Sequence, residues 1–487
     1  MPSPDAQPAP RRPALVALVL SLAWTVLGTV LVFSDRIPTR ADYDQKLYHL
    51  KAIKQFAEEW PRFDFWHYLS ATTPGYHLLM AAVWKFVSPT VVALQLVAVL
   101  ITAGLVGLLG HAAGKRASPL IATAVCLPFV CSPYVVSAGA WLLPDNLGWL
   151  LVLAVLLLAL HRRLSPLGMA AAGAVLLALV FVRQIHIWSA ATLWVGALLT
   201  EDVDGSSAPA GTDGRSLLRR LLPDPGRQLR RLGLALIATA PAFALLGLFI
   251  HYWGGPVPPV FQGWFHEMNY SAGALVLATF GAYGIIFAGL WWPGLVKLWK
   301  TSPAWVYGPV IAGAAYAAAV STTFNPNVGR TSGLWNLAAK GPMVAAHTSP
   351  IMVVLVMLGA IVLTALLTAA TLRQCLVLLA AIAGFIAANT ANNDLFQRYV
   401  DPFVLMLLAL MASMAATHAR RMCTAAGPIG LALVLSAITA RGVINTDRRV
   451  SGPDPPARTP SEFDTKNVPC EMPRPPKPPD RRFWPWS

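Results

Sequence analysis

Long apolar runs recur along almost the whole chain and restrict the fold to one class. Runs of 15 to 25 residues follow one another from Leu15 to Val443, hydrophobic residues make up 56% of the 487 residues, and the mean hydropathy is +0.57. A helix needs about 20 apolar residues to cross a bilayer core of about 30 Å. This composition is that of a membrane protein and excludes an ordinary soluble domain. The sequence predicts an all-α polytopic membrane protein.

Basic clusters between the runs predict how the chain crosses the membrane. Arg11 and Arg12 precede the first run, 14–33, and no small-residue cleavage pattern follows it, so it is interpreted as a retained span. Cytoplasmic loops are enriched in Lys and Arg, which places the N-terminus in the cytoplasm. The net charge of +15 lies in such clusters and is therefore interpreted as a topology signal. We expect membrane lipids as neighbours and no nucleic acid.

The alternation of runs and basic clusters predicts about thirteen spans and an extracytoplasmic C-terminus. The stretch 165–199 would be about 50 Å long as one helix, far more than a bilayer core, so a hairpin with Arg183 and His186 at its turn is predicted. Residues 74–88 are predicted to lie as a helix at the outer interface. Single spans are expected near 14–33, 90–111, 118–137, 146–160, 232–252, 272–292, 303–321, 348–371, 374–390, 400–416 and 426–443.

Two parts of different character are predicted. Residues 1–446 form the transmembrane domain, with a first outer loop at 35–89 and a basic inner loop at 201–231 that is expected to be flexible and to rest on anionic headgroups. Residues 447–487 form an outer tail that is too rich in proline and charge to bury a core, so disorder is expected there.

Charge is concentrated in the first outer loop. Residues 40–77 hold 10 charged side chains, whereas charged residues are 12% of the whole chain. Apolar residues recur at helical spacing after Asp44, which predicts an interfacial amphipathic helix. Asp44 could cap that helix, or it could be a carboxylate that takes a proton from an acceptor hydroxyl. Asp42 is the rival for the second role.

Further polar residues fall on the same predicted outer face, each with a simpler structural interpretation. Asp145 follows Pro144 and could be a helix cap. Arg183 could extend to lipid headgroups. Arg398, next to Tyr399, could form an ion pair with Asp394 or Asp401 that orders a loop. Arg330 lies in a turn-rich segment that suits a loop near a ligand.

Three of these segments together resemble a known family. Asp44-Gln45 followed by Tyr48-His49, the stretch Thr72 to Tyr76 (TTPGY), and the pair Arg183-Gln184 in a later apolar stretch are similar to the dolichyl-phosphate-glucose-dependent α-1,2-glucosyltransferases. Compared with that pattern, one extra residue precedes Tyr48-His49. More broadly, an Asp in the first outer loop and a second one at Asp145 resemble the GT-C membrane glycosyltransferases. The resemblance covers the first 200 residues, and the remainder only in architecture.

The resemblance implies a GT-C-like fold and an inverting hexosyl transfer from a polyprenyl-phosphate-linked sugar to a lipid-linked glycan, polysaccharide or protein acceptor. Asp44, Asp42 and Asp145 are the implied catalytic carboxylates. The leaving phosphate must meet cations, and Arg183, Arg330, Lys340 and Arg398 are the candidates. The implied substrate-binding residues are His49, Tyr48, Arg183, Gln184, His186, Arg330, Arg398 and Tyr399.

No cofactor is predicted with a defined site. A divalent ion, Mg or Mn, is compatible with the chemistry, but His186 and the pair His266-Glu267 have no spacing that indicates a metal geometry. The five cysteines have no metal-binding spacing either.

The rival function is a secondary transporter or a lipid or polysaccharide flippase, which would have a similar number of spans. Transporters place ionisable groups near the bilayer midplane on broken helices. The middles of the apolar runs here are almost free of charge. The sequence therefore favours a multi-pass membrane enzyme whose active face is extracytoplasmic.

Overall fold

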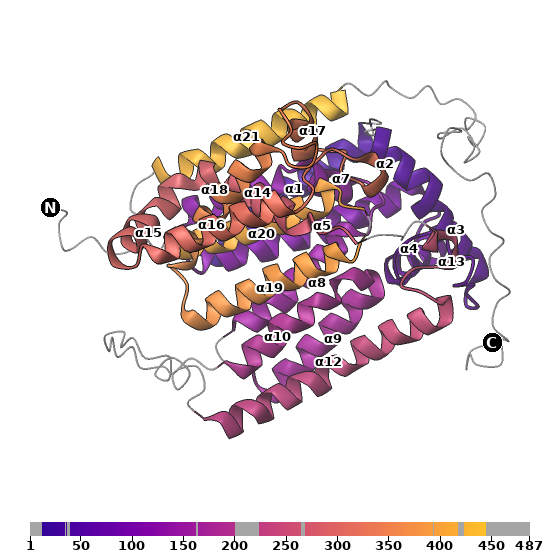
Figure 1. Cartoon of the computed structure of the whole chain (residues 1–487). Helices are drawn as coiled ribbons and strands as arrows, with labels where there is room; N and C mark the ends of the chain where they lie inside the picture. Colours follow the sequence, from indigo (N-terminus) through magenta and orange to yellow (C-terminus); the bar gives the residue numbers. More distant parts are fainter. Residues whose placement is uncertain are drawn as a thin grey trace.

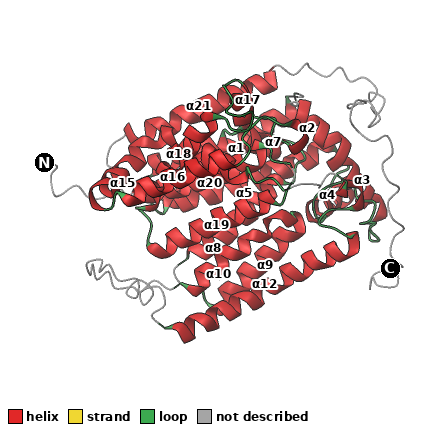
Figure 2. Ribbon diagram, viewed as in Figure 1, coloured by secondary structure: helices red, strands yellow, loops and turns green. Residues whose placement is uncertain are grey.

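The protein is a bundle of α-helices. The computed structural model describes residues 12–34, 36, 39–161, 164–199, 224–263, 268–392, 394–416 and 423–444. In these ranges every regular element is helical and no strand occurs (Figure 2). The all-α prediction is confirmed. The tail at 447–487 and most of the basic loop at 201–231 lie outside the described residues, but Pro225 to Arg231 already belong to a helix.

The helices follow one another with few long connections (Figure 1). In the first half they are α1 (Pro13–Phe33), α2 (Thr39–Asp44), η1 (Gln45–His49), α3 (Leu50–Glu59), α4 (Gly75–Phe86), α5 (Val91–Gly114), α6 (Pro119–Val130), α7 (Pro133–Ala140), α8 (Asp145–Leu160), α9 (Pro166–Val182), η2 (Gln184–Trp188) and α10 (Ser189–Leu198). In the second half they are α12 (Pro225–Trp253), α13 (Pro259–Gln262), α14 (Ala272–Gly284), η3 (Ile285–Phe287), α15 (Ala288–Thr301), α16 (Ala304–Ala319), η4 (Pro326–Val328), α17 (Leu334–Ala339), α18 (Pro350–Leu367), α19 (Leu372–Thr390), α20 (Gln397–Ala415) and α21 (Cys423–Ile444).

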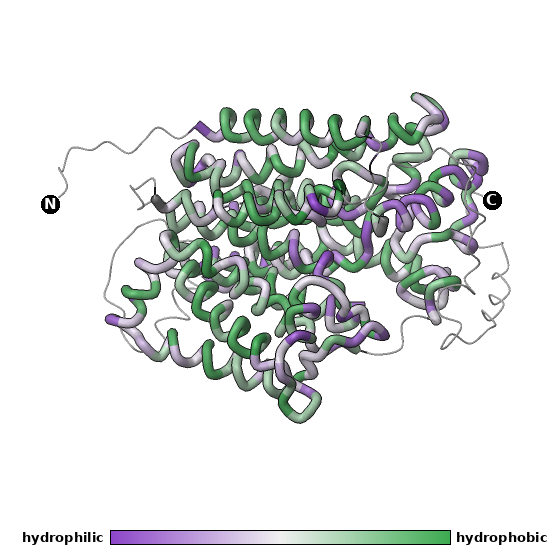
Figure 3. Tube along the Cα trace, turned by 90° about the horizontal axis from the view of Figure 1, so that it is seen from above, coloured by the Kyte–Doolittle hydropathy of each residue, from purple (hydrophilic) through white to green (hydrophobic). Residues whose placement is uncertain are grey.

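Eight of the described helical stretches are long and apolar enough to cross a membrane, or nine if the bent pair α6 and α7 forms one span. Three further apolar helices, α8, α9 and α16, are shorter. Several long apolar helices fit a multi-pass membrane protein. Figure 3 shows hydrophobic residues along most of the helix lengths and more hydrophilic residues toward their ends.

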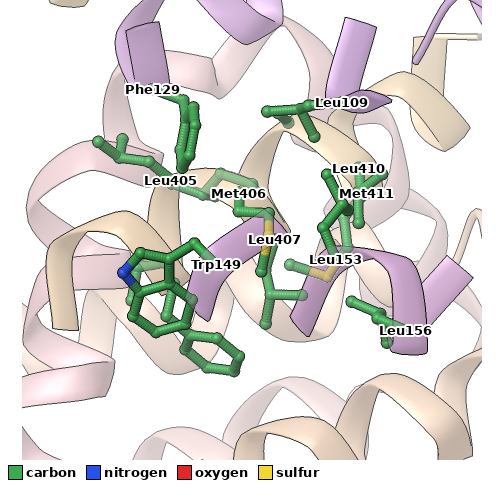
Figure 4. Close-up of a cluster of buried hydrophobic side chains, with 14 of the residues drawn as sticks. Leu109, Phe129, Trp149, Leu153, Leu156, Leu405, Met406, Leu407, Leu410 and Met411 are labelled. Atoms are coloured by element: carbon green, nitrogen blue, oxygen red, sulfur yellow. The ribbon is translucent and has the colours of Figure 1, made fainter. Parts of the chain in front are cut away.

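Helix α20 forms the centre of the bundle, and its position explains why its sequence is apolar on every side. Residues Val404 to Ala412 are at most 1% exposed. Their side chains pack with Leu109, Phe129, Trp149, Leu153 and Leu156 from three other helices (Figure 4). A helix that is apolar all round is expected to be buried. By contrast, α12 and α21 lie at opposite edges of the bundle in Figure 1 and expose apolar side chains such as Ile237 and Leu433.

Small residues let α14 and α18 pack closely. A Cβ atom on Gly281 would lie 2.0 Å from the backbone oxygen of Leu355, and one on Gly359 would lie 1.9 Å from that of Leu277. Only glycine fits at either position. Close backbone approach through small residues is the usual way in which membrane helices gain packing energy.

The stretch 165–199 forms the predicted hairpin. Helix α9 ends at Val182 and α10 begins at Ser189, while Met169 near the start of α9 packs with Ala197 near the end of α10. The span predicted at 118–137 corresponds to two helices, α6 and α7, between which the chain bends by 74°. Ser132 lies at this bend, where its hydroxyl accepts a hydrogen bond from the backbone N–H of Tyr134.

Candidate active site

The helix predicted to start at Asp44 begins earlier than expected. Residues 39–59 are helical throughout, so Asp44 lies inside the run and has helical backbone angles instead of capping its start. The interpretation of Asp44 as an N-terminal cap is therefore wrong. Residues Gln45–His49 form one π-helical turn, in which the N–H of Leu50 donates to the carbonyl of Gln45, five residues earlier. Such turns often occur at functional sites.

Asp44 pairs with an arginine that is 354 residues away in the chain. The Nη1 atom of Arg398, in the first turn of α20, lies 2.5 Å from Oδ2 of Asp44. The expected pairing of Arg398 with Asp394 or Asp401 is not the one found. Asp42 instead forms an ion pair with Lys46 on its own helix, at 3.7 Å between Oδ2 and Nζ. The two rival carboxylates are thus in different surroundings.

Asp145 forms a second carboxylate–arginine pair. It is the first residue of α8, and its side chain makes an ion pair with Nη1 of Arg183 at the end of α9. No side chain caps the N-terminus of α8, so the cap interpretation of Asp145 does not hold. Arg183 does not extend away from the protein, because its side chain is only 13% exposed.

Tyr399 joins the two pairs. The guanidinium carbon of Arg183 lies 5.3 Å from the centre of the Tyr399 ring, and that of Arg398 lies 5.1 Å from it. Arg398 also donates to the Tyr399 hydroxyl at 3.2 Å. We call Asp44, Asp145, Arg183, Arg398 and Tyr399 the charge cluster. It lies at the end of the bundle where α8 begins, α9 ends and α20 begins.

His49 links the charge cluster to a buried chain of hydrogen bonds. Its Nδ1 lies 2.8 Å from Nε2 of His77, and Nδ1 of His77 is hydrogen-bonded to the hydroxyl of Tyr68. Burial lowers the pKa of His49 to about 4, and Asp44 and Asp145 oppose that shift only in part. His49 is therefore neutral at pH 7. Sequence reasoning missed His77 and Tyr68; the only available signal was that His77 directly follows the TTPGY stretch.

The burial of His49 predicts that the stability of the protein depends on pH. Because the pKa of His49 is lower when folded than its unfolded value of about 6.5, the unfolded state binds more protons and stability is lost as the pH falls from about 6.5 toward 4. We expect the thermal unfolding midpoint of His49→Gln in detergent to fall less over this range than that of the original protein. The exposed His251→Gln variant is the control. Equal acid sensitivity of the two variants would contradict the assignment.

The TTPGY stretch and the Arg183-Gln184 pair are in direct contact. The backbone N–H of Thr73 donates to Oε1 of Gln184 at 2.9 Å, and the Thr73 hydroxyl donates to the carbonyl of Val180 at 2.6 Å. Nε2 of Gln184 donates to the carbonyls of Ala71 and Pro256, each at 3.0 Å. Both amide hydrogens of Gln184 are used, so in this arrangement it holds the backbone and offers no donor to a substrate.

Gly75 allows the start of α4 to approach the end of α9. A Cβ atom at this position would lie 2.6 Å from the backbone oxygen of Phe181, which cannot move like a side chain. We expect Gly75→Ala to destabilise the protein by about 1–3 kcal/mol, measured as a lower thermal midpoint. In Gly104→Ala the new methyl would meet only a Leu150 side-chain atom at 3.8 Å. An equal loss in both variants would contradict the packing argument.

Three other predicted binding residues, His186, Tyr48 and Arg330, make contacts of their own. His186 packs its ring against Trp149, with 4.8 Å between ring centres. Tyr48 packs against Tyr43 and Phe261 at 5.9 and 6.1 Å. Arg330 instead bonds to the Ser271 hydroxyl at 3.2 Å and to the Ser321 carbonyl. These contacts of Arg330, together with its position over the Trp335 ring, belong to a separate loop contact.

The donor set of the charge cluster does not fit a divalent ion. Each of its two carboxylates already faces a guanidinium group, which repels a cation. Among the described residues no group of three or more His, Cys, Asp or Glu side chains is placed to hold a metal. His266 and Glu267 lie outside the described residues.

The arrangement can bind and orient an anion next to a carboxylate. Two guanidinium groups converge on one aromatic ring, two carboxylates balance them, and a neutral histidine lies beside all four charges. Guanidinium groups match phosphate oxygens in a bidentate way. Comparison with known proteins adds no relative: no family model, no curated protein and no solved structure matches this chain.

Proposed function

We propose that the protein is a GT-C-type membrane glycosyltransferase that moves a sugar from a polyprenyl-phosphate donor to a lipid-linked glycan, polysaccharide or protein acceptor. The observation that carries this proposal is the meeting of Asp44, Asp145, Arg183 and Arg398, from four distant segments, around Tyr399. We further propose about thirteen spans, with α8, α9, α10 and α16 among them. The charge cluster then faces the extracytoplasmic side, and α2 to α4 lie along the outer interface.

The proposed mechanism follows from the charge balance of the cluster. Without a ligand, two positive charges pair with two negative charges. A lipid phosphate competes for Arg398 and Arg183, and this competition releases Asp44 from its ion pair and makes it more basic. The acceptor oxygen then forms a bond to the anomeric carbon, the bond from that carbon to the phosphate oxygen breaks, and Asp44 takes the acceptor proton. The polyprenyl phosphate leaves with the bonding electrons, and its charge is stabilised by the arginines.

One experiment tests the proposal directly. The purified protein in liposomes is offered a panel of polyprenyl-phosphate sugars together with crude lipid and glycan acceptors, and loss of sugar from each donor is measured. We expect one donor to be consumed and its sugar to appear on an acceptor. If every donor remains intact, the transferase proposal is contradicted.

One observation favours the rival transporter or flippase. Asp401 is fully buried one turn into α20, where it accepts hydrogen bonds from Ser132 at 2.6 Å, from Gln397 at 3.4 Å and from Tyr283. Buried carboxylates within spans often carry protons in transporters. Movement of an intact lipid-linked sugar across the bilayer, lost in Asp401→Asn, would favour that function. The transferase proposal expects no such movement.

A further inference from the structure

A small pocket lies next to the charge cluster. It is lined by Trp149, Arg183, Ile185, His186, Phe385, Asn389 and Tyr399. Arg183 and Tyr399 also belong to the charge cluster, so the pocket and the proposed phosphate site share two side chains. The remaining walls come from α8, η2 and α19, which pack on one another in the bundle.

Three buried side chains in this pocket carry polar atoms without a partner among the described residues. These atoms are Nδ1 and Nε2 of His186, Oδ1 of Asn389 and Nε1 of Trp149. The three side chains are only 1–2% exposed. In Figure 4 the nitrogen-bearing edge of Trp149 is turned away from Leu153 and Leu407. Buried polar atoms are nearly always hydrogen-bonded, and each one left unpaired costs about 1–3 kcal/mol. Several such atoms in one pocket indicate a ligand.

The unpaired atoms define the chemistry of that ligand. Nδ2 of Asn389 already donates to the Phe385 carbonyl at 2.9 Å, so only the acceptor oxygen of this amide remains. Burial lowers the pKa of His186 to about 3, and a neutral imidazole offers one donor and one acceptor. Trp149 offers a donor. A hydroxyl group can both donate and accept these hydrogen bonds, whereas an anion would be repelled by the acceptor oxygen of Asn389.

We propose that this pocket binds a hydroxyl group of the sugar that is transferred, and that this sugar is neutral. The inference rests on the proposed function, because it is the phosphate beside Arg183 that places the attached sugar next to the pocket. Asn389 and His186 then form hydrogen bonds with one hydroxyl group of the sugar. A donor that lacks this hydroxyl group therefore binds more weakly.

The test compares three ligands in lipid nanodiscs: polyprenyl phosphate, the polyprenyl-phosphate hexose that is consumed in the transfer assay, and its monodeoxy analogues. We expect the hexose to bind about 10- to 100-fold more tightly than the analogue that lacks the recognised hydroxyl group. Asn389→Leu and His186→Phe should remove that difference and leave the affinity for polyprenyl phosphate unchanged. The control is Asn336→Leu, a change at an exposed position.

The outcomes separate the two proposals. If Asn389→Leu and His186→Phe keep the full preference for the hexose, the pocket does not bind the sugar hydroxyl group and this inference is overturned. Sugar transfer by the original protein would still support the proposed function. The same conclusion follows if every monodeoxy analogue binds as tightly as the hexose. Absence of binding and transfer for every polyprenyl-phosphate sugar would overturn both proposals.

Discussion

Replacing Asp44 by asparagine should reduce sugar transfer by about 10²- to 10⁴-fold, the range that a positioned general base contributes. Asparagine preserves the size of the side chain and can still accept a hydrogen bond from Arg398, but it cannot take a proton from an acceptor hydroxyl. The loss should therefore appear in kcat, whereas binding of polyprenyl phosphate should persist. Transfer from the consumed donor by protein in liposomes is the measurement.

Asp42→Asn provides the matched control for this prediction. Asp42 is two residues away on the same helix and pairs with Lys46, outside the charge cluster. We expect this variant to stay within about threefold of the original activity, because the Lys46 side chain is 40% exposed and an ion pair with an exposed partner contributes about 0–1 kcal/mol. The thermal midpoints of both variants must be recorded, since a lost ion pair can also destabilise the fold. Full activity of both variants would remove the general-base assignment.

Replacing Arg373 by methionine should cost about 3 kcal/mol or more of stability. Arg373 lies in the first turn of α19 and is only 3% exposed. Its guanidinium donates to the carbonyls of Ala159 and Leu160 at the end of α8, and of Gly196 and Leu199 at the end of α10, at 2.7 to 3.3 Å. Helix C-termini leave carbonyls without intrahelical partners and carry partial negative charge. Methionine would fill the space and leave these acceptors unpaired, each at about 1–3 kcal/mol.

The thermal midpoint in detergent and the amount of folded protein should both fall for this variant. Lys297→Met removes an exposed basic residue and should change the midpoint little. Because α8 is 16 residues long, Arg373 lies about 24 Å from Asp145 along this helix, so the effect is on folding and not on the chemistry. An unchanged midpoint for Arg373→Met would show that these hydrogen bonds contribute nothing.

The apolar pattern predicted the fold better than it predicted the breaks in the helices. Runs such as 374–390 and 400–416 correspond to α19 and α20 within three residues at each end, because burial in a bilayer and burial in the bundle require the same residue types. The pattern missed the bend at Ser132, since a polar residue that bonds to Asp401 looks like any other small residue in a sequence. The role of Arg373 could not be predicted from its sequence neighbours, because its carbonyl partners come from segments more than 170 residues away.

The sequence predicted which residues belong to the candidate site, but not which of them form ion pairs with one another. Asp44, Asp145, Arg183, Arg398 and Tyr399 were all proposed from their types and from the predicted face of the membrane. Their pairing could not be predicted, because it depends on how α2, α8, α9 and α20 pack together. From the sequence, Arg398 was expected to form an ion pair with its neighbours Asp394 or Asp401, whereas in the structure it forms an ion pair with Asp44. The hydrogen-bonded chain from His49 to Tyr68 was missed for the same reason.

The π-helical turn at Gln45–His49 determines where the helical stretch 39–59 can lose or gain a residue. It follows directly on Asp44 and contains Tyr48-His49. Removing one residue within the turn would give the hydrogen bond from the Leu50 N–H to the Gln45 carbonyl the i to i+4 spacing of an α-helix, and the flanking residues would face nearly as before. Removing one residue from the first α-helical turn of α3 would instead rotate everything before it by about 100° relative to the rest of α3. Asp44 would then face away from Arg398, although no side chain at either position had been altered. The π-helical turn can thus absorb a change of one residue, whereas the α-helical turns beside it cannot change length without breaking the ion pair between Asp44 and Arg398.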